Sequence, residues 1–291
     1  MKLPLLEYHA PQTVEGVLDL LDEHGDEAKV IAGGQSLMPM MAMRLARPAQ
    51  LIDINGVSTL GGIDEQGGVL AFGATTRERE AERSRLVAER LPVLAEALPF
   101  IGHVSIRNRG TIGGSIAHAD ASAELPAIAL ITDAQIVVRS RRGERTIAAD
   151  DFFVSHYTTT LSDDECLVEV RMPTGPSGAG WSFQEVARRP GDFALVGAIA
   201  MVALDEDAAI DRARICLFGV SDRPVRAAEV EAALAGATAS LDAFDAAASD
   251  AAEYLEPASD MHGSSAYRRH LARVTVRRAL TRAAQRAGAP L

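Results

Sequence analysis

TIGGS at residues 111–115 and AGGQS at residues 32–36 share one pattern, in which two consecutive glycines are followed by a serine within two residues. Because glycine has no Cβ and readily adopts positive φ, paired glycines let a ligand come close to the backbone. Consecutive backbone amides in such a turn can point at one anion, and a helix that follows adds the positive end of its dipole. The two stretches therefore predict two contacts to one long anionic ligand, for which a dinucleotide pyrophosphate is the natural candidate.

The length and composition are those of a globular protein with two or three modules. The 291 residues exceed one ordinary domain, and 47% hydrophobic residues are ample for a core. The formal net charge of −11 disfavours nucleic acid or an anionic membrane surface as the main partner. The longest apolar run, residues 193–204, is too short to cross a bilayer. We therefore expect no nucleic acid partner and no membrane span.

Cysteine usage and the N-terminal sequence favour a cytoplasmic protein. The first residues lack the long apolar core of a secretory signal. Cys166 and Cys216 are the only cysteines, which excludes a disulfide scaffold and an iron–sulfur cluster held by four cysteines of this chain. No ligand spacing typical of a metal site is present. No arrangement typical of a serine or cysteine nucleophile is present either, so we assign no catalytic residue.

A basic stretch near the C-terminus contrasts with the acidic composition of the chain. Such a run is usually the solvated face of a helix. The alternative is a surface that docks onto an acidic partner subunit. The arginines concerned are Arg268, Arg269, Arg273, Arg277, Arg278 and Arg282.

Hydrophobic periodicity and turn residues divide the chain into three parts. Strands at 28–32 and 51–54 enclose the first glycine stretch in a β-α-β-like module. The middle part alternates strands with helices, including a helix at 124–131. After a glycine-rich linker at 174–180, strands at 181–187, 195–204 and 212–220 predict an antiparallel meander, followed by helices from residue 226. The predicted domains are residues 1–56, 57–174 and 175–291.

The two glycine stretches differ in how specific they are. The first is not a Rossmann fingerprint, because GxGxxG is absent, and a single Gly-Gly turn is usually only a turn. The second lies in a run of small and polar residues that contains His118, Asp120 and Glu124 and would not pack a core alone. Such a run suits sugar hydroxyls and a heterocycle. His118 as a plain surface histidine and Asp120 as a helix cap remain alternatives.

Together these stretches resemble the FAD-binding medium subunits of the molybdenum hydroxylases, a family that includes aerobic carbon monoxide dehydrogenase and xanthine dehydrogenase. The resemblance covers essentially the whole chain. Ala121 stands where the family often has proline, and Phe193 stands where close relatives often carry an aromatic hydroxyl. The motifs that carry the resemblance are AGGQSL at 32–37, NRGTIGGSIAHADASAELPA at 108–127 and ARRPGDFA at 187–194.

The resemblance implies an α+β fold of the vanillyl-alcohol-oxidase (PCMH) type. Two α/β subdomains that bind FAD would precede a C-terminal α+β domain with a three-stranded antiparallel sheet and helices. FAD would be bound non-covalently, because Gln35 occupies the loop and some relatives attach FAD to a histidine. A large subunit would hold molybdopterin and a small subunit two [2Fe–2S] clusters. Electrons would pass from the clusters through FAD to an external acceptor.

Two alternative functions are a self-sufficient flavin oxidoreductase on the same fold and a non-catalytic module that has lost FAD. The substrate of the complex is not encoded here, because its pocket would lie on another chain. Carbon monoxide, a purine, an aldehyde and an N-heterocycle all remain open.

The resemblance also implies which residues contact FAD. The glycine stretches would hold the pyrophosphate, Glu124 would contact ribityl or adenosine hydroxyls, and Phe193 would lie beside the isoalloxazine. The implied FAD-binding residues are Ala32, Gly33, Gly34, Gln35, Ser36, Leu37, Thr111, Ile112, Gly113, Gly114, Ser115, His118, Asp120, Glu124, Leu125, Asp192 and Phe193.

A methionine-rich stretch follows the first glycine turn, with Met38, Met40, Met41 and Met43. Methionine fills irregular gaps in cores, so core packing is one interpretation. The other is that part of this stretch contacts the iron–sulfur subunit beside the flavin.

Overall fold

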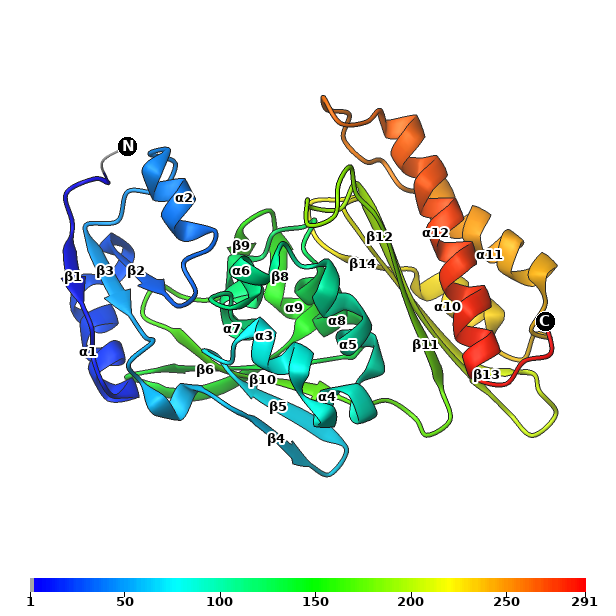
Figure 1. The fold of residues 1–291 in the computed structure, drawn as a ribbon, viewed down its shortest axis with the longest axis horizontal. Helices are drawn as coiled ribbons and strands as arrows, with labels where there is room; N and C mark the ends of the chain where they lie inside the picture. Colours follow the sequence, from blue (N-terminus) through cyan, green and yellow to red (C-terminus); the bar gives the residue numbers. More distant parts are fainter. Residues whose placement is uncertain (1–2) are drawn as a thin grey trace.

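Three main β-sheets follow one another along the chain, each with its own helices (Figure 1). The structure is a computed structural model that describes residues 3–291. In Figure 1 the first sheet lies at the left, the second forms the floor of the middle part, and the third stands at the right between the middle part and the C-terminal helices.

The first sheet is parallel and carries the first glycine turn. Its order is β1-β3-β2, with β1 at Glu7–His9, β2 at Ala28–Ile31 and β3 at Gln50–Asp53. Helix α1, Val14–His24, begins at Thr13, whose Oγ1 accepts a hydrogen bond from the Gly16 amide, and it buries its apolar face against the sheet. The short helix α2, Leu37–Ala42, follows the glycine turn. The predicted β-α-β module is therefore present, and the three-residue β1 is an addition that the sequence did not indicate.

The second sheet is antiparallel and has helices on one face (Figure 1). Its order is β4-β5-β10-β6-β7, and β6 and β7 form a hairpin. The polar segment after Thr76 forms two helices that are separated at Ser84, whose hydroxyl caps the second helix by accepting a hydrogen bond from the Val87 amide. The strands are β4 Ile63–Gln66, β5 Val69–Gly73, β6 Gln135–Ser140, β7 Gly143–Ala148 and β10 Cys166–Pro173, and a small hairpin pairs β8 Phe153–Ser155 with β9 Thr158–Thr159. The helices are α3 Glu78–Arg83, α4 Arg85–Arg90, α5 Pro92–Ala97, α6 Val104–Arg107, α7 Ile112–His118, α8 Glu124–Ile131 and α9 Ala149–Phe152.

The third sheet is the predicted antiparallel meander. Strands β11 Gly180–Val186, β12 Val196–Leu204 and β13 Ile210–Phe218 pair in sequence order. The two-residue strand β14, Val225–Arg226, joins β13, so the sheet has four strands and not the expected three. The helices α10 Ala228–Leu234, α11 Leu241–Glu253 and α12 Ser265–Arg286 cover its outer face (Figure 1).

One hydrophobic core joins the second and third sheets. Helix α8 is buried along its whole length and packs against the β11–β13 sheet. Trp181 and Phe183 of β11 and Phe218 of β13 belong to the same buried cluster as Leu70 and Phe72 of β5. The middle and C-terminal parts of the chain are thus packed against each other as firmly as one domain interior.

Helix α12 approaches β11 closely because residue 180 is glycine. A Cβ at Gly180 would overlap the carbonyl oxygen of Ala283 and would lie 2.6 Å from the amide nitrogen of Ala287. Both obstacles are backbone atoms of the helix, so they cannot move aside without shifting α12.

We expect Gly180→Ala to lower the melting temperature of the chain. Overpacking of this kind costs about 1–3 kcal/mol, and each kcal/mol corresponds to about 2–4 °C in a protein of this size. Differential scanning fluorimetry measures the change. Gly61→Ala is the matched control, because a Cβ at Gly61 would make only ordinary contacts, the nearest at 3.6 Å. Equal melting temperatures for the two variants would contradict the tight packing of α12.

Candidate functional site

The two glycine turns are in direct backbone contact. A Cβ at Gly33 would overlap the carbonyl oxygen of Arg109 and would lie 2.8 Å from the Cα of Gly110. A Cβ at Gly114 would lie 3.6 Å from the Cβ of Ala32. Two segments that are far apart in the sequence therefore meet without any side chain between them at Gly33. This absence of a side chain is the physical reason for a glycine at that position.

The first turn presents a row of unpaired amides. Within residues 3–291, the amide groups of Gly33, Gly34, Gln35 and Ser36 donate no hydrogen bond. Gly34 has φ +71°, which reverses the chain here, and the side-chain amide of Gln35 donates to the Gly33 carbonyl at 2.9 Å. Consecutive amides held in this way form a concave anion-binding nest. Because buried amides are normally paired, and Gly33 is buried, this turn lacks an acceptor that a bound anion would supply.

The amides of the second turn are already paired with protein acceptors. Ile112 donates to the Thr76 carbonyl at 3.0 Å, and Gly113 donates to the Ala74 carbonyl at 3.1 Å. Thr111 is the acceptor for the next two amides. Its hydroxyl accepts a hydrogen bond from the Gly114 amide and its carbonyl accepts one from the Ser115 amide, both at 3.0 Å.

The second turn is therefore fastened to the end of β5. A Cβ at Gly113 would lie 2.6 Å from the Cα of Ala74, so this glycine makes room for the protein itself. The expectation that both turns offer amides to one anion thus differs from the structure for residues 112–115. In the described part of the chain, the hydroxyl groups of Ser36 and Ser115 form no hydrogen bond, so they are available to a ligand.

A polar bridge connects the two turns. The Asn55 side-chain amide donates to the Ala32 carbonyl at 2.7 Å, and its oxygen accepts from the Arg77 guanidinium at 2.6 Å. The same guanidinium donates to the Arg109 carbonyl at 2.5 Å. Sequence reasoning missed both residues. The signal for Asn55 is its position after β3, because β2 and β3 are parallel and their carboxyl ends meet at one edge.

Asp53 holds Asn55 in place. Its carboxylate accepts a hydrogen bond from the backbone amide of Asn55 at 2.8 Å and another from the Tyr8 hydroxyl at 2.6 Å. Burial alone would raise the pKa of Asp53, but these hydrogen bonds outweigh it and lower the pKa. Asp53 is therefore ionised at neutral pH and fixes the end of β3.

Three carboxyl groups, of which Glu78 and Glu124 are buried and Glu185 is half-buried, form an acidic cluster near the second turn. Glu124, the first residue of α8, is 4% exposed, and burial raises its pKa to about 7. Glu78 of α3 is also 4% exposed and lies against Gly110. Burial, followed by the charge of Glu124, raises the pKa of Glu78 to about 8. The same two causes, in the same order, raise the pKa of Glu185 on β11 to about 8.

Glu78 and Glu185 are mostly protonated at neutral pH, because their pKa values are about 8. The Oε2 atoms of Glu78 and Glu185 have no hydrogen-bond partner among residues 3–291. A neutral carboxyl group tolerates such a position at much lower cost than a carboxylate does. Sequence reasoning identified Glu124 and missed Glu78 and Glu185, because nothing in the local pattern marks these two glutamates as buried.

His118 and Asp120 lie next to Tyr157. The His118 ring centroid is 4.9 Å from that of Tyr157, and burial lowers the pKa of His118. Asp120 accepts from the Ser122 amide at 2.9 Å and from the Tyr157 hydroxyl at 3.3 Å. Helix α8 begins only at Glu124, so Asp120 stabilises the preceding turn and is not the helix cap considered from the sequence.

The remaining implied residues are spread between core and surface. Leu125 is fully buried in the shared core. Asp192 and Phe193 lie in the exposed connection between β11 and β12, where Phe193 is 58% exposed. Gly191, at φ +85°, lies so close to His103 that its Cβ would be 2.9 Å from the imidazole ring. The connection therefore contacts the segment that leads into the second glycine turn.

The methionine-rich stretch is divided between the core and the surface. Met41 is fully buried, which confirms core packing for this residue. At the other end of the stretch, Met43 is 54% exposed and Leu45 is 70% exposed. Met43 and Leu45 therefore remain available to a partner.

Metal sites and membrane spans are absent from residues 3–291. No group of three or more His, Cys, Asp or Glu side chains there is placed to hold a metal ion. No helix in this range has the length and apolar character needed to cross a bilayer.

Comparisons with known proteins agree along the whole chain. The family model described as the FAD binding domain in molybdopterin dehydrogenase matches residues 4–175, and the CO dehydrogenase flavoprotein C-terminal domain matches residues 181–283. The 6-hydroxypseudooxynicotine dehydrogenase complex subunit alpha of Paenarthrobacter nicotinovorans is 43% identical, over 99% of this chain and 97% of the relative. The carbon monoxide dehydrogenase medium chain of Hydrogenophaga pseudoflava is 40% identical, over 96% of this chain and 97% of the relative.

Solved structures show the same fold. The carbon monoxide dehydrogenase from Hydrogenophaga pseudoflava matches with a TM-score of 0.95 and 40% identity, over 98% of this chain and 99% of that chain. The quinoline 2-oxidoreductase from Pseudomonas putida 86 matches with a TM-score of 0.94 and 39% identity, over 99% of both chains.

We expect Glu78 to make stability depend on pH. Its pKa is about 8 in the folded chain against an ordinary value of 4.5 for a glutamate, so the folded state binds the extra proton between these values. The free energy of unfolding therefore falls as pH rises from about 4.5 to about 8. Glu78→Gln removes this loss, so its melting temperature relative to the native chain should rise between pH 5.5 and pH 8.5 by a few degrees.

Thermal unfolding at several pH values measures the effect. The exposed Glu80 provides the control variant Glu80→Gln, which should follow the native chain at every pH. A constant difference between Glu78→Gln and the native chain would show that Glu78 is ionised in the folded state.

Proposed function

Because this chain belongs to the FAD-binding medium subunits of the molybdenum hydroxylases, we propose that its first glycine turn binds the FAD pyrophosphate and that its second turn holds the first in shape. The chain is the FAD-binding electron-transfer subunit of a multi-subunit oxidoreductase. Molybdopterin and the [2Fe–2S] clusters belong to a large and a small partner subunit.

The unpaired amides of residues 33–36 carry this proposal. Four consecutive donors without an acceptor equal in number the four non-bridging oxygens of a pyrophosphate, which carry its negative charge. The hydroxyls of Ser36 and Ser115 add two donors, one from each turn. Each amide of residues 112–115 has a protein partner, so the second turn acts on the ligand through Ser115 and by its contact with Gly33. These observations fit an FAD site.

The other implied contacts form the remainder of the proposed site. Glu124 would accept hydrogen bonds from hydroxyl groups of the cofactor. Because Glu124 is buried, the loss of such a bond would cost more binding free energy than at the surface. His118, neutral because burial lowers its pKa, and Asp120 line the same side. Asp192 and Phe193, in the exposed β11–β12 connection, would contact the isoalloxazine. The set is that implied by the sequence, with Asn55 and Arg77 added as residues that position the two turns.

Bound FAD supplies the exchange of single electrons and electron pairs that links iron–sulfur clusters to a two-electron acceptor. The residues of this chain bind it and set its electrostatic surroundings. Asn55 and Arg77 fix the position of the two turns relative to each other through their hydrogen bonds to the carbonyls of Ala32 and Arg109. Glu78 and Glu185 hold their protons, which avoids two uncompensated negative charges near an anionic ligand. We propose that no residue from 3 to 291 acts as a base that would activate a substrate.

The substrate of the complex is determined elsewhere. Relatives named for 6-hydroxypseudooxynicotine, carbon monoxide and caffeine are 43%, 40% and 35% identical to this chain. Such chemically different names at similar identity indicate that the medium subunit does not select the substrate. We propose that the large subunit does.

We propose a cytoplasmic location and three domains. Cys166 and Cys216 are both buried and unpaired, as expected in a reducing compartment. The strands of the three main sheets fall within residues 7–53, 63–173 and 180–226, which supports domains at 1–56, 57–174 and 175–291.

We expect Gly33→Ala to abolish most FAD binding. The new Cβ would collide with the backbone of Arg109 and Gly110, which separates the turns and distorts the row of amides. The ratio of flavin absorbance to protein in the purified variant measures the loss, and circular dichroism verifies that the chain is folded. Gly61→Ala is again the control. A folded Gly33→Ala variant with a full complement of FAD would refute the proposed role of the turn.

The purified chain should contain FAD but should not oxidise carbon monoxide, aldehydes, purines or N-heterocycles. It lacks four cysteines for a cluster, and residues 3–291 hold no metal site. Activity should return only with both partner subunits, as measured by reduction of an artificial electron acceptor. Steady turnover of such a substrate by this chain alone would instead support a self-sufficient flavoenzyme.

A further inference from the structure

The six arginines of the basic stretch all lie on α12, but only three of them form hydrogen bonds or ion pairs through their guanidinium groups with other residues from 3 to 291. Arg268 donates to Asp260 at 2.7 Å and to the Leu195 carbonyl at 2.6 Å. Arg269 donates to the Leu255 carbonyl at 3.0 Å, and Arg273 pairs with Asp245 at 2.8 Å. These three, all in the first half of the helix, fasten α12 to its surroundings.

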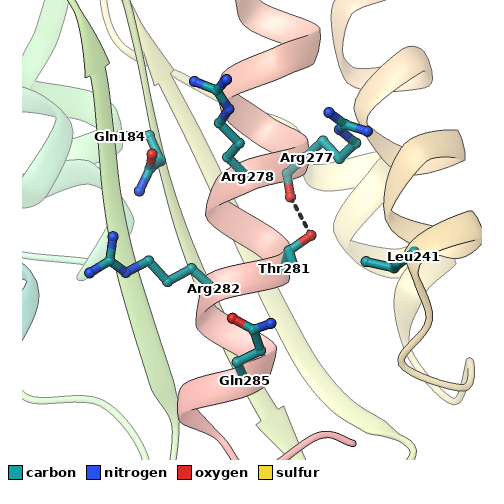
Figure 2. A pocket seen from close by; sticks show the side chains of 7 residues that line it. All are labelled: Gln184, Leu241, Arg277, Arg278, Thr281, Arg282 and Gln285. Atoms are coloured by element: carbon teal, nitrogen blue, oxygen red, sulfur yellow. Dashed lines mark hydrogen bonds between the residues drawn. The ribbon is translucent and has the colours of Figure 1, made fainter. Parts of the chain in front are cut away.

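The other three arginines have no partner. The guanidinium groups of Arg277, Arg278 and Arg282 form neither a hydrogen bond nor an ion pair with any residue from 3 to 291, and all three residues are exposed. They line a groove of about 530 Å³, shown in Figure 2. The remaining lining residues are Gln184, Leu241, Thr281 and Gln285.

The arrangement of the groove suits carboxylate groups. Figure 2 shows Arg278 and Arg282 on the side of α12 that faces β11, and Arg277 on the side that faces α11. Residues 277–285 span about 12 Å along the helix at 1.5 Å per residue, which matches three or four residues of an extended segment. Guanidinium groups form paired hydrogen bonds with carboxylates. Gln184 and Gln285 offer further polar contacts.

The lining of the groove argues against two other occupants. Leu241 is its only apolar side chain, so an apolar partner surface would find little to pack against. No aromatic side chain lines the groove, so nothing there would stack on the base of a nucleotide. Helix α12, which carries most of the lining residues, lies at the opposite end of the ribbon from β2 and α2, between which the first glycine turn lies (Figure 1).

Charge complementarity points in the same direction. The chain carries a net charge of −11, yet it concentrates three unpaired positive charges here. Arg278 and Arg282 are four residues apart on the helix, where like charges repel each other. The isolated chain therefore carries a small electrostatic cost at this groove. An acidic partner would relieve that cost.

We propose that the groove of Arg277, Arg278 and Arg282 docks an acidic segment of a partner subunit in the assembled enzyme. The carboxylates of that segment pair with the guanidinium groups along α12. This inference rests on the proposed function, because it requires that the chain works within a complex.

The test compares two double variants in the complex. Arg278→Gln/Arg282→Gln removes two charges, and Arg278→Glu/Arg282→Glu reverses them. Each variant is co-produced with the large and small subunits, and the dissociation constant of the purified complex is measured at several salt concentrations. The glutamine variant should weaken assembly about tenfold, and the glutamate variant should weaken it further. The native complex should show the steepest dependence on salt.

Arg212→Glu is the matched control, because Arg212 is exposed on β13 and unpaired among residues 3–291. It should assemble like the native chain. Native assembly of both double variants at low salt would overturn the proposal. So would binding of inorganic pyrophosphate to the isolated native chain that is lost in the glutamine variant while assembly stays normal, since the groove would then be a small-anion site.

The flavin content of the isolated chain separates this inference from the proposed function. Both double variants should retain the native ratio of FAD to protein and the native melting temperature. If the native chain itself contained no FAD, the proposed function would fail, and the assembly measurements would still decide the role of the groove.

Discussion

The contact between Gly33 and the backbone of Arg109 and Gly110 is the constraint on which the site depends. Two turns from different sheets meet there with no side chain between them. Asn55 and Arg77 reinforce this contact with hydrogen bonds to the carbonyls of Ala32 and Arg109. Within residues 3–291 the first turn keeps four amides unpaired, whereas the amides of residues 112–115 are all paired. A preformed row of donors binds an anion without a further ordering cost.

The sequence predicted those parts of the fold that depend on local pattern. Helix α8 begins and ends at the expected residues, 124 and 131, because its apolar run is bounded by turn residues. The meander β11–β13 was predicted because its strands are long and rich in β-forming residues. Strands β1 and β14 were missed, since they have three and two residues and exist only through pairing with β3 and β13.

In the candidate site, too, the local sequence pattern did not predict features that depend on tertiary packing. The two glycine stretches have nearly the same local pattern, yet only the first leaves its amides unpaired. The amides of the second donate hydrogen bonds to Ala74, Thr76 and Thr111. Only the packing of α7 against β5 decides between these outcomes. Glu78 and Glu185 likewise look like ordinary surface glutamates in the sequence. Their burial depends on α3, α8 and β11 coming together, which no local pattern encodes.

The core shared by the second and third sheets has a consequence for synthesis of the chain. Ribosomes release the N-terminal part first, so α8 and β5 emerge before Trp181, Phe183 and Phe218 can cover them. Until β13 has left the ribosome, the nascent chain exposes an apolar surface that the finished protein hides completely. The middle part therefore completes its apolar packing only after strands β11 to β13 have been synthesised.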